Sequence, residues 1–306
     1  MKKIITLFIL LSAVMSGCSK AEEEPKEPAI FTNAVKNTAE ASEDIKKIKS
    51  SGDVLYGLYS NNFLSSANIT SFSNKVPNVE IYSIETDIYS PFPSEFVLKC
   101  YSEGKTPLIT IKYGTSAPDM AKFASLAGEL DIPIILDIFP CYGIQNYREY
   151  TENFTLFCQL IKKYAPNAQI VWSFCPDTET DPNLYQGKTY VDYIGLICYI
   201  QNPYDNMEQL SSLKNACEKF KYEKPIILTR FAVSHFNSND HTYKTEGAEK
   251  FIEYFYKDFI LEYPQIKAVV YANSDVNDTN YLYFERSDYS LTSEPELLSK
   301  FVEIIE

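Results

Sequence analysis

Eight short apolar runs, each about as long as a β-strand, recur along this 306-residue chain and alternate with polar or amphipathic segments. Within each run the apolar residues are nearly continuous. Continuous runs are typical of parallel strands that are covered on both faces, and their alternation with helices predicts an α/β fold. The expected strands are residues 53–59, 79–84, 107–113, 133–139, 170–174, 191–199, 225–231 and 267–272.

Helical patterns lie between these strands, and one of them carries Pro118 in its first turn, where proline is favoured. Eight strand–helix units in about 250 residues predict a (β/α)8 TIM barrel. A doubly wound open sheet is the structural alternative, but no GxGxxG loop follows the first strand. The expected helices are residues 38–50, 96–103, 118–129, 147–164, 207–220, 246–263 and 295–305.

The amino terminus resembles a bacterial lipoprotein signal. Lys2 and Lys3 precede an apolar run at residues 4–14, which is too short to span a bilayer as a helix. The run ends in small residues before Cys18, which resembles a lipobox and implies cleavage before Cys18 and a lipid anchor on it. An ordinary signal peptide with an incidental cysteine is the alternative.

Residues 19–27 (SKAEEEPKE) are acidic, polar and unable to bury apolar area, so they predict a flexible tether. We therefore expect a signal peptide at 1–17, the lipidated cysteine and acidic tether at 18–37, and one barrel domain with an amino-terminal helix at 38–306. The expected location is extracytoplasmic, at the outer membrane or cell surface. Whether the protein faces the periplasm or the outside stays open.

Composition narrows the possible partners. The chain has 41 acidic and 28 basic residues, and no basic stretch indicates a nucleic-acid surface. Its 24 tyrosines and 19 phenylalanines can fill a core and can also stack against sugars. We expect a monomer that binds a polysaccharide or oligosaccharide.

The cysteines and histidines indicate neither a metal site nor a cofactor. Six cysteines besides Cys18 form no CxxC pair, and Cys175 and Cys198 lie in apolar runs, so free buried thiols are expected despite a compartment that permits disulfides. The two histidines, His235 and His241, fall in one loop-like stretch. We interpret them as loop residues rather than acid–base groups.

In a barrel of this kind, function resides at the carboxyl-terminal ends of the strands. The residues there are mostly aromatic or polar, which suits a polyhydroxylated ligand. For Trp172 the alternative to sugar binding is a role in the core. For the acidic residues at strand ends the alternative is that they keep the surface soluble. The candidate glycan-binding residues are Glu85, Asp87, Tyr113, Tyr142, Trp172, Tyr199, Arg230 and Asp275.

Residues 167–177 (NAQIVWSFCPD) and 184–199 (LYQGKTYVDYIGLICY) resemble glycoside hydrolase family 26, which includes β-mannanases. The family pattern Y-x-G-x-x-Y-V-D-x-x-G-x-x-x-Y is matched from Tyr185 to Tyr199, with Asp192 placed to orient the loop and Gly195 to allow close packing. The resemblance implies a barrel and retaining hydrolysis by two glutamates. One would be the acid of a His-Glu pair after the fourth strand, and the other the nucleophile after the seventh.

This chain departs from that pattern at both positions. The fourth-strand pair reads Pro140-Cys141, and Arg230 stands where the nucleophile belongs. No glutamate lies between Asp131 and Arg148 or between Lys224 and Thr245, so a shifted register restores neither. Retaining hydrolysis needs two carboxyl groups about 5 Å apart.

Two hypotheses follow. In the first, the barrel binds glycan without retaining glycosidase activity, and Arg230 contacts an anionic ligand group or forms an ion pair with Asp137. In the second, the chain is a hydrolase or lyase with relocated carboxylates, for which Asp137 is the leading catalytic candidate. Glu85, Asp87, Asp177 and Asp275 are the other candidate carboxylates, and Cys141 is a weaker candidate nucleophile.

Overall fold

The structure is a computed structural model of the whole chain. It describes residues 54–64, 66–141, 144, 146–177, 185, 189–201, 203, 208–237, 240–274 and 287–306. The expected signal peptide, Cys18, the tether and the helix at 38–50 therefore lie outside the described residues, as do Tyr142 and Asp275. All described residues belong to one compact unit, Asn37–Glu306.

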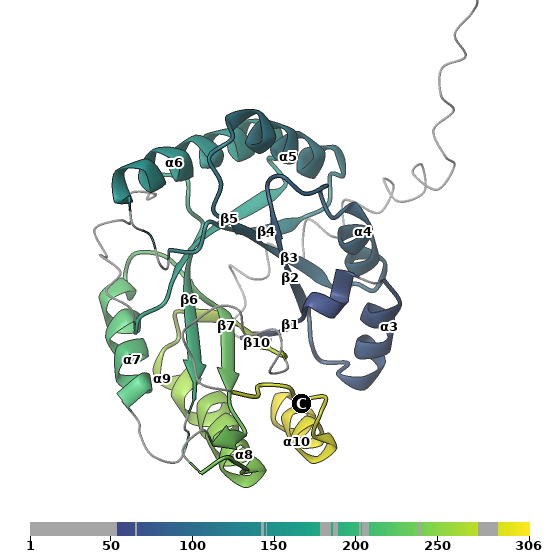
Figure 1. Cartoon of the computed structure of the whole chain (residues 1–306), viewed down its shortest axis with the longest axis vertical. Helices are drawn as coiled ribbons and strands as arrows, with labels where there is room; N and C mark the ends of the chain where they lie inside the picture. Colours follow the sequence, from purple (N-terminus) through teal and green to yellow (C-terminus); the bar gives the residue numbers. More distant parts are fainter. Residues whose placement is uncertain are drawn as a thin grey trace, which may run out of the picture. The chain divides into compact units, whose positions relative to one another are not determined.

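Eight parallel strands close into a barrel, which confirms the predicted TIM-barrel fold (Figure 1). The order around the barrel is β1-β10-β7-β6-β5-β4-β3-β2, so the first strand pairs with the last. Every strand end lies within three residues of its predicted position. The strands are β1 (Leu55–Tyr59), β2 (Ile81–Asp87), β3 (Thr106–Lys112), β4 (Ile134–Ile138), β5 (Ala168–Phe174), β6 (Tyr193–Ile200), β7 (Ile226–Val233) and β10 (Ile266–Ala272).

Helices form a ring outside the strands (Figure 1). Their apolar faces pack on the outward side chains of the barrel, which explains why the strand sequences lack polar alternation. Pro118 lies in the first turn of α5 as predicted, and the side chain of Asn146 caps α6 by accepting from the N–H of Glu149. The longer helices are α3 (Ser66–Lys75), α4 (Ser94–Ser102), α5 (Ala117–Glu129), α6 (Tyr147–Tyr164), α7 (Glu208–Phe220), α8 (Thr245–Tyr254) and α10 (Pro295–Ile305).

Three features of the fold differ from the sequence-based expectation. Helix α3 and the short 3-10 helix η2 (Asn61–Leu64) follow β1, where no helix was predicted, because serine, asparagine and threonine are weak helix signals. The predicted helix at 246–263 is divided into α8, a π-helical turn η4 (Phe255–Phe259) and α9 (Ile260–Glu262). A small hairpin of β8 (Phe236–Asn237) and β9 (Thr242–Tyr243) follows β7.

Two residues of the family-like motif act as the sequence suggested. A Cβ at Gly195 would lie 2.4 Å from the Cβ of Ser173, so only glycine allows β6 to pack this closely on β5. The carboxylate of Asp192 accepts from the N–H of Ile170 at 2.9 Å and pairs with Lys162 of α6 at 2.8 Å. These contacts fix the start of β6 against β5.

The six cysteines that follow Cys18 are all buried thiols that form no disulfide among the described residues, as expected. None of the helices within the described residues is both long and apolar enough to cross a membrane.

Candidate functional site

A buried ion pair spans the barrel mouth, by which we mean the carboxyl-terminal ends of the eight strands. Nη2 of Arg230 on β7 lies 2.6 Å from Oε2 of Glu85 on β2, and each side chain is only 4% exposed. These strands are separated by β1 and β10, so the pair reaches across the barrel. Nζ of Lys112 on β3 lies 2.7 Å from the other oxygen of Glu85 and is 49% exposed. Glu85 thus joins a buried cation to one at the surface.

Two tyrosines complete the surroundings of Arg230. Its guanidinium carbon lies 4.2 Å from the centroid of the Tyr59 ring, within the range of a cation–π interaction. Tyr199 of β6 lies close enough to Arg230 for the guanidinium charge to act on its hydroxyl. Burial raises the pKa of Tyr199, and the charge of Arg230 opposes that rise. We call these five residues, Tyr59, Glu85, Lys112, Tyr199 and Arg230, the mouth network.

Asp137 of β4 is wholly buried inside the barrel. Its carboxylate accepts from the hydroxyl of Ser173 at 2.6 Å and from that of Thr110 at 3.4 Å. Burial raises the pKa of Asp137 to about 6, against the opposing effects of the Ser173 hydrogen bond and the Arg230 charge. A carboxyl group with this pKa can exist in either protonation state near neutrality.

The hypothesis that Arg230 forms an ion pair with Asp137 is wrong, because the carboxylate that pairs with Arg230 is Glu85. The sequence placed both an acid and the arginine near the barrel axis but could not tell which strand supplies the partner. Asp137 is instead hydrogen bonded by neutral hydroxyls, and the Arg230 charge acts on it as a lesser influence than burial.

The end of β4 is sterically constrained. Phe139 has a positive φ of 50°, a left-handed conformation that costs free energy in a residue with a Cβ. Its carbonyl accepts from the hydroxyl of Tyr150 at 2.9 Å. The next residue but one, Cys141, is buried, and burial raises the pKa of its thiol to about 11. A thiol in that state is a poor nucleophile at neutral pH.

The remaining predicted residues lie in different places. Asp87 binds the backbone of the turn that follows β2, and Tyr113 is half-buried with its hydroxyl accepting from Asn153 at 3.0 Å. Trp172 is fully buried between the barrel and the helices, where its Nε1 donates to the hydroxyl of Tyr150 at 3.1 Å. Its ring therefore presents no open face to a ligand, which agrees with the core alternative.

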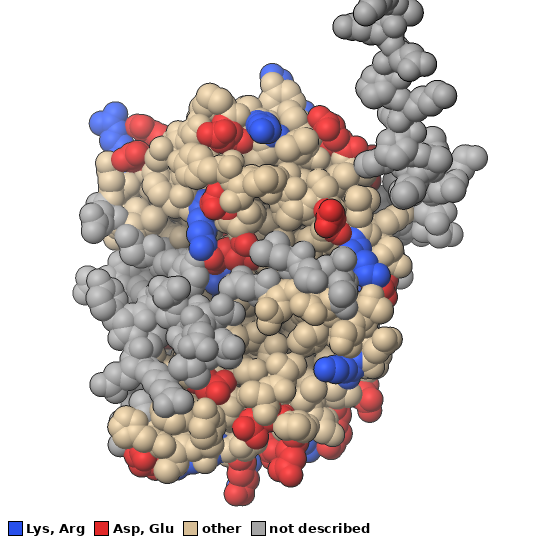
Figure 2. Space-filling view, turned by 45° about the vertical axis from the view of Figure 1, so that its right-hand side comes forward, with Lys and Arg blue, Asp and Glu red and all other residues tan. Residues whose placement is uncertain are grey.

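Tyr89 at the mouth was missed by the sequence reasoning. It follows β2, two residues beyond Asp87, and it is 61% exposed. Single exposed tyrosines are common, so its sequence position alone carries no signal. On the face seen in Figure 2, the described lysines and arginines lie apart from one another and near acidic residues, so charge does not single out a ligand site there.

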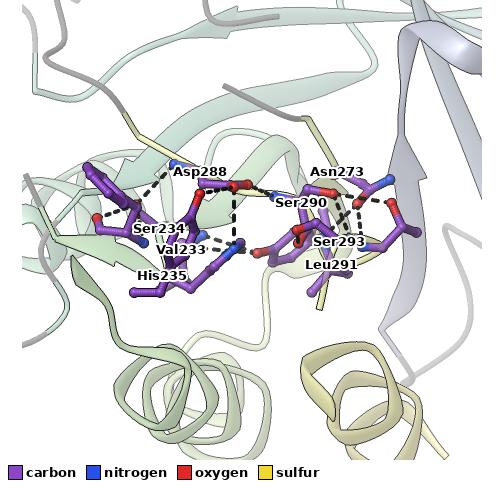
Figure 3. Close-up of polar contacts among 12 residues, drawn as sticks. Val233, Ser234, His235, Asn273, Asp288, Ser290, Leu291 and Ser293 are labelled. Atoms are coloured by element: carbon purple, nitrogen blue, oxygen red, sulfur yellow. Dashed lines mark hydrogen bonds and ion pairs between the residues drawn. The ribbon is translucent and has the colours of Figure 1, made fainter. Parts of the chain in front are cut away.

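A second polar cluster, also missed, joins the loop after β7 to the segment before α10 (Figure 3). The Ser234 hydroxyl accepts from the backbone N–H of Asp288 at 3.3 Å, and the carbonyl of Asp288 accepts from the N–H of His235 at 3.0 Å. The hydroxyl of Tyr243 lies 3.4 Å from Asp288 Oδ2. We call these four residues, Ser234, His235, Tyr243 and Asp288, the loop clasp.

His235 is the unusual member of the loop clasp. Its imidazole is wholly buried, and neither ring nitrogen has a hydrogen-bond partner among the described residues. The carboxylate of Asp288 lies 3.6 Å from Nε2. Burial lowers the pKa of His235, and the negative charges of Asp288 and Glu294 oppose that change. His235 lies in the loop after β7, as the sequence indicated, but its side chain is buried.

The loop clasp contacts the mouth network through one residue. Tyr289 follows Asp288, and its ring centroid lies 5.2 Å from that of Tyr199. Beside it, the side chain of Asn273 accepts from the N–H groups of Leu291 at 2.8 Å and Thr292 at 3.3 Å. Within the part of the chain that is described, no group of three or more histidine, cysteine or acidic residues could hold a metal ion.

Comparison with solved structures shows the same fold at low sequence identity. Xylanase 10B from Thermotoga maritima superposes with a TM-score of 0.57 at 14% identity over 84% of this chain and 98% of that one. A GH113 β-1,4-mannanase gives 0.53 at 12% identity over 83% and 98%. A mannanase from Bacillus subtilis gives 0.47 at 15% over 82% and 87%. No protein-family model matches the sequence, and no curated protein matches it.

Proposed function

We propose that this chain is an extracytoplasmic lipoprotein, anchored through Cys18, whose monomeric barrel binds a glycan without retaining glycosidase activity. The fold is shared with xylanases and mannanases, which act on polysaccharides. The observation that carries the proposal is the state of two buried carboxyl groups, one at the mouth and one inside the barrel. Glu85 is neutralised by two cations, and Asp137 is sealed inside the barrel.

Retaining hydrolysis needs an acid and a nucleophile that both face the substrate. Glu85 is a weak nucleophile because Arg230 and Lys112 stabilise its negative charge. Arg230 stands on β7, and a cation there repels a positively charged transition state. The motif resemblance together with these substitutions supports a barrel that has kept a sugar-binding mouth and lost the catalytic pair.

One observation favours the alternative, an active hydrolase or lyase with relocated carboxylates. The pKa of Asp137 is raised to about 6, which suits a proton donor. Its burial opposes this role, because a catalytic acid must reach the oxygen that it protonates.

The test is binding and turnover on a panel of mannans, xylans and acidic polysaccharides by the soluble chain from Ala29. We expect binding without new reducing ends and without unsaturated products. The control for Asp137→Ala is Glu129→Ala, which removes an exposed carboxylate at the end of α5, at the opposite end of the barrel from the mouth. Products that Asp137→Ala abolishes and Glu129→Ala leaves unchanged would establish the enzyme instead.

The anchor is tested separately with the full chain. We expect detergent partitioning and lipid labelling in the unaltered protein and loss of both in Cys18→Ala. Partitioning that survives the substitution would refute lipidation at Cys18.

A further inference from the structure

We propose that Tyr89 is a preformed stacking platform for a pyranose ring and that Asp87 is the residue that positions it. The inference rests on the proposed glycan binding and assigns a specific contact to it. Tyr89 is 61% exposed, yet both its backbone N–H and its hydroxyl form hydrogen bonds.

The backbone of Tyr89 is fixed by Asp87. Oδ1 of Asp87 accepts from the N–H of Tyr89 at 2.8 Å and from that of Ser90 at 2.7 Å, and Oδ2 accepts from the Ser90 hydroxyl at 3.0 Å. An aspartate that caps a turn in this way limits the backbone to one conformation. The turn therefore directs the Tyr89 side chain from the end of β2 toward the loop after β3.

The other end of the side chain meets that loop. The hydroxyl of Tyr89 accepts from the backbone N–H of Thr115 at 3.4 Å. A Cβ at Gly114 would lie 2.5 Å from Cδ1 of Ile88 and 3.4 Å from the Tyr89 hydroxyl, so the glycine leaves room for the Ile88 side chain between the two loops. The hydroxyl end of the side chain thus meets the β3 loop, while most of the residue stays in water.

An exposed ring held in one place is suited to binding. Tyrosine offers a large, flat, amphipathic contact area, and a side chain that is already ordered loses little conformational entropy when a ligand arrives. The C–H face of a pyranose is apolar and matches the face of the ring, whereas its hydroxyls suit polar neighbours such as Lys112 at the end of β3.

Tyr222 provides the matched control. It is 92% exposed, in the turn between α7 and β7, which is at the opposite end of the barrel. Replacing it with alanine removes an even more exposed tyrosine without touching the mouth.

The experiment is calorimetric titration of the soluble chain from Ala29 with whichever polysaccharides of the panel bind it, together with thermal melting. We expect Tyr89→Ala to weaken binding by roughly tenfold, comparable to the loss of one stacking ring elsewhere. Tyr222→Ala should bind as the unaltered chain does, and Tyr89→Phe, which keeps the ring but loses the hydrogen bond from Thr115, should bind more weakly than the unaltered chain and more tightly than Tyr89→Ala. Asp87→Ala should weaken binding, and Asp87→Asn, which can still accept from the turn, should restore most of it.

The binding results distinguish failure of the proposed function from failure of the Tyr89 platform. If the unaltered chain binds no glycan, both the proposed function and the platform are wrong. If it binds but Tyr89→Ala binds equally well, only the platform is wrong. If Tyr222→Ala weakens binding as much as Tyr89→Ala, the contact is nonspecific adsorption and the platform is again overturned.

Discussion

The ion pair between Glu85 and Arg230 should be the most sensitive polar contact of the barrel. Removing one partner of a buried pair leaves an uncompensated charge and costs about 3–5 kcal/mol of folding free energy. We therefore expect Arg230→Met and Glu85→Gln each to lose roughly this amount, because both side chains are almost completely buried. Lys112 is half exposed, so Lys112→Met should cost about 1 kcal/mol or less.

The double variant Glu85→Gln/Arg230→Met separates pairing from packing. If the two charges depend on each other, the double variant should be hardly less stable than either single variant, so the coupling energy should be about as large as one single loss, roughly 3–5 kcal/mol. The matched control is Arg148→Met, since Arg148 pairs with Glu152 at 3.0 Å on an exposed helix surface. That substitution should change stability by less than about 0.5 kcal/mol.

Equilibrium unfolding of the soluble chain in urea measures all five variants. A loss of less than about 1 kcal/mol in both Arg230→Met and Glu85→Gln would refute the reasoning, because the pair would then be hydrated. Additive losses in the double variant would instead show that each residue is held by other neighbours.

Three further predictions concern the titration of Asp137, the titration of His235 and the accessibility of the cysteine thiols. In the folded chain the pKa of Asp137 is raised to about 6, so its contribution to stability is fully present below the ordinary value of 3.8 and is lost as the pH rises through about 6. As the pH rises from 4 to 7, the free energy of unfolding of Asp137→Asn in urea should therefore increase by roughly 2–3 kcal/mol relative to that of the unaltered chain. A difference between the two proteins that does not change with pH would contradict the raised pKa of Asp137. The pKa of His235 is lowered by burial, so its contribution is present above about pH 6.5 and declines as the pH falls below that value. The protection factors for hydrogen exchange in residues 234–237 and 240–244, which correct for the slower intrinsic exchange in acid, should fall at pH 5 in the unaltered chain and less so in His235→Phe, and an equal fall would exclude His235 as the cause. Ellman's reagent should detect no rapidly reacting thiol in the folded chain from Ala29 and six after unfolding, because all six are buried. A rapidly reacting thiol in the folded chain would place at least one cysteine at the surface.

The fold was predictable because the strands of a parallel barrel are covered on both faces and therefore need nearly continuous apolar sequences. Strands that are covered on both faces, such as β6, must be almost wholly apolar, and the helices between them must be amphipathic. Helix α3 was missed since its sequence, SANITSFSNK, contains few good helix formers, and tertiary packing overrides that weakness. The division of the helix after β9 at Phe255 left no signal in the hydrophobic pattern.

The sequence predicted which strand ends carry the site residues, but it could not predict which of these residues contact one another. Strand-end reasoning found Glu85, Tyr199 and Arg230, which the structure brings into one network. It could not find the Glu85–Arg230 pair, because 145 residues separate the two partners and four of the predicted strands carried candidate acids. Asp288 was overlooked because it follows no predicted strand, and its role depends on a contact with a loop 54 residues earlier.

The pairing of β1 with β10 has a consequence for how the chain acquires its structure. Leu55 is opposite Ala268 in that pair, so the ring closes between segments more than 200 residues apart. A nascent chain that has reached only α7 has strands at both margins with unfilled backbone hydrogen bonds, and such edges invite association with other chains. Productive folding must therefore await synthesis of almost the whole polypeptide, and a truncation before residue 266 should yield aggregates rather than a smaller stable domain.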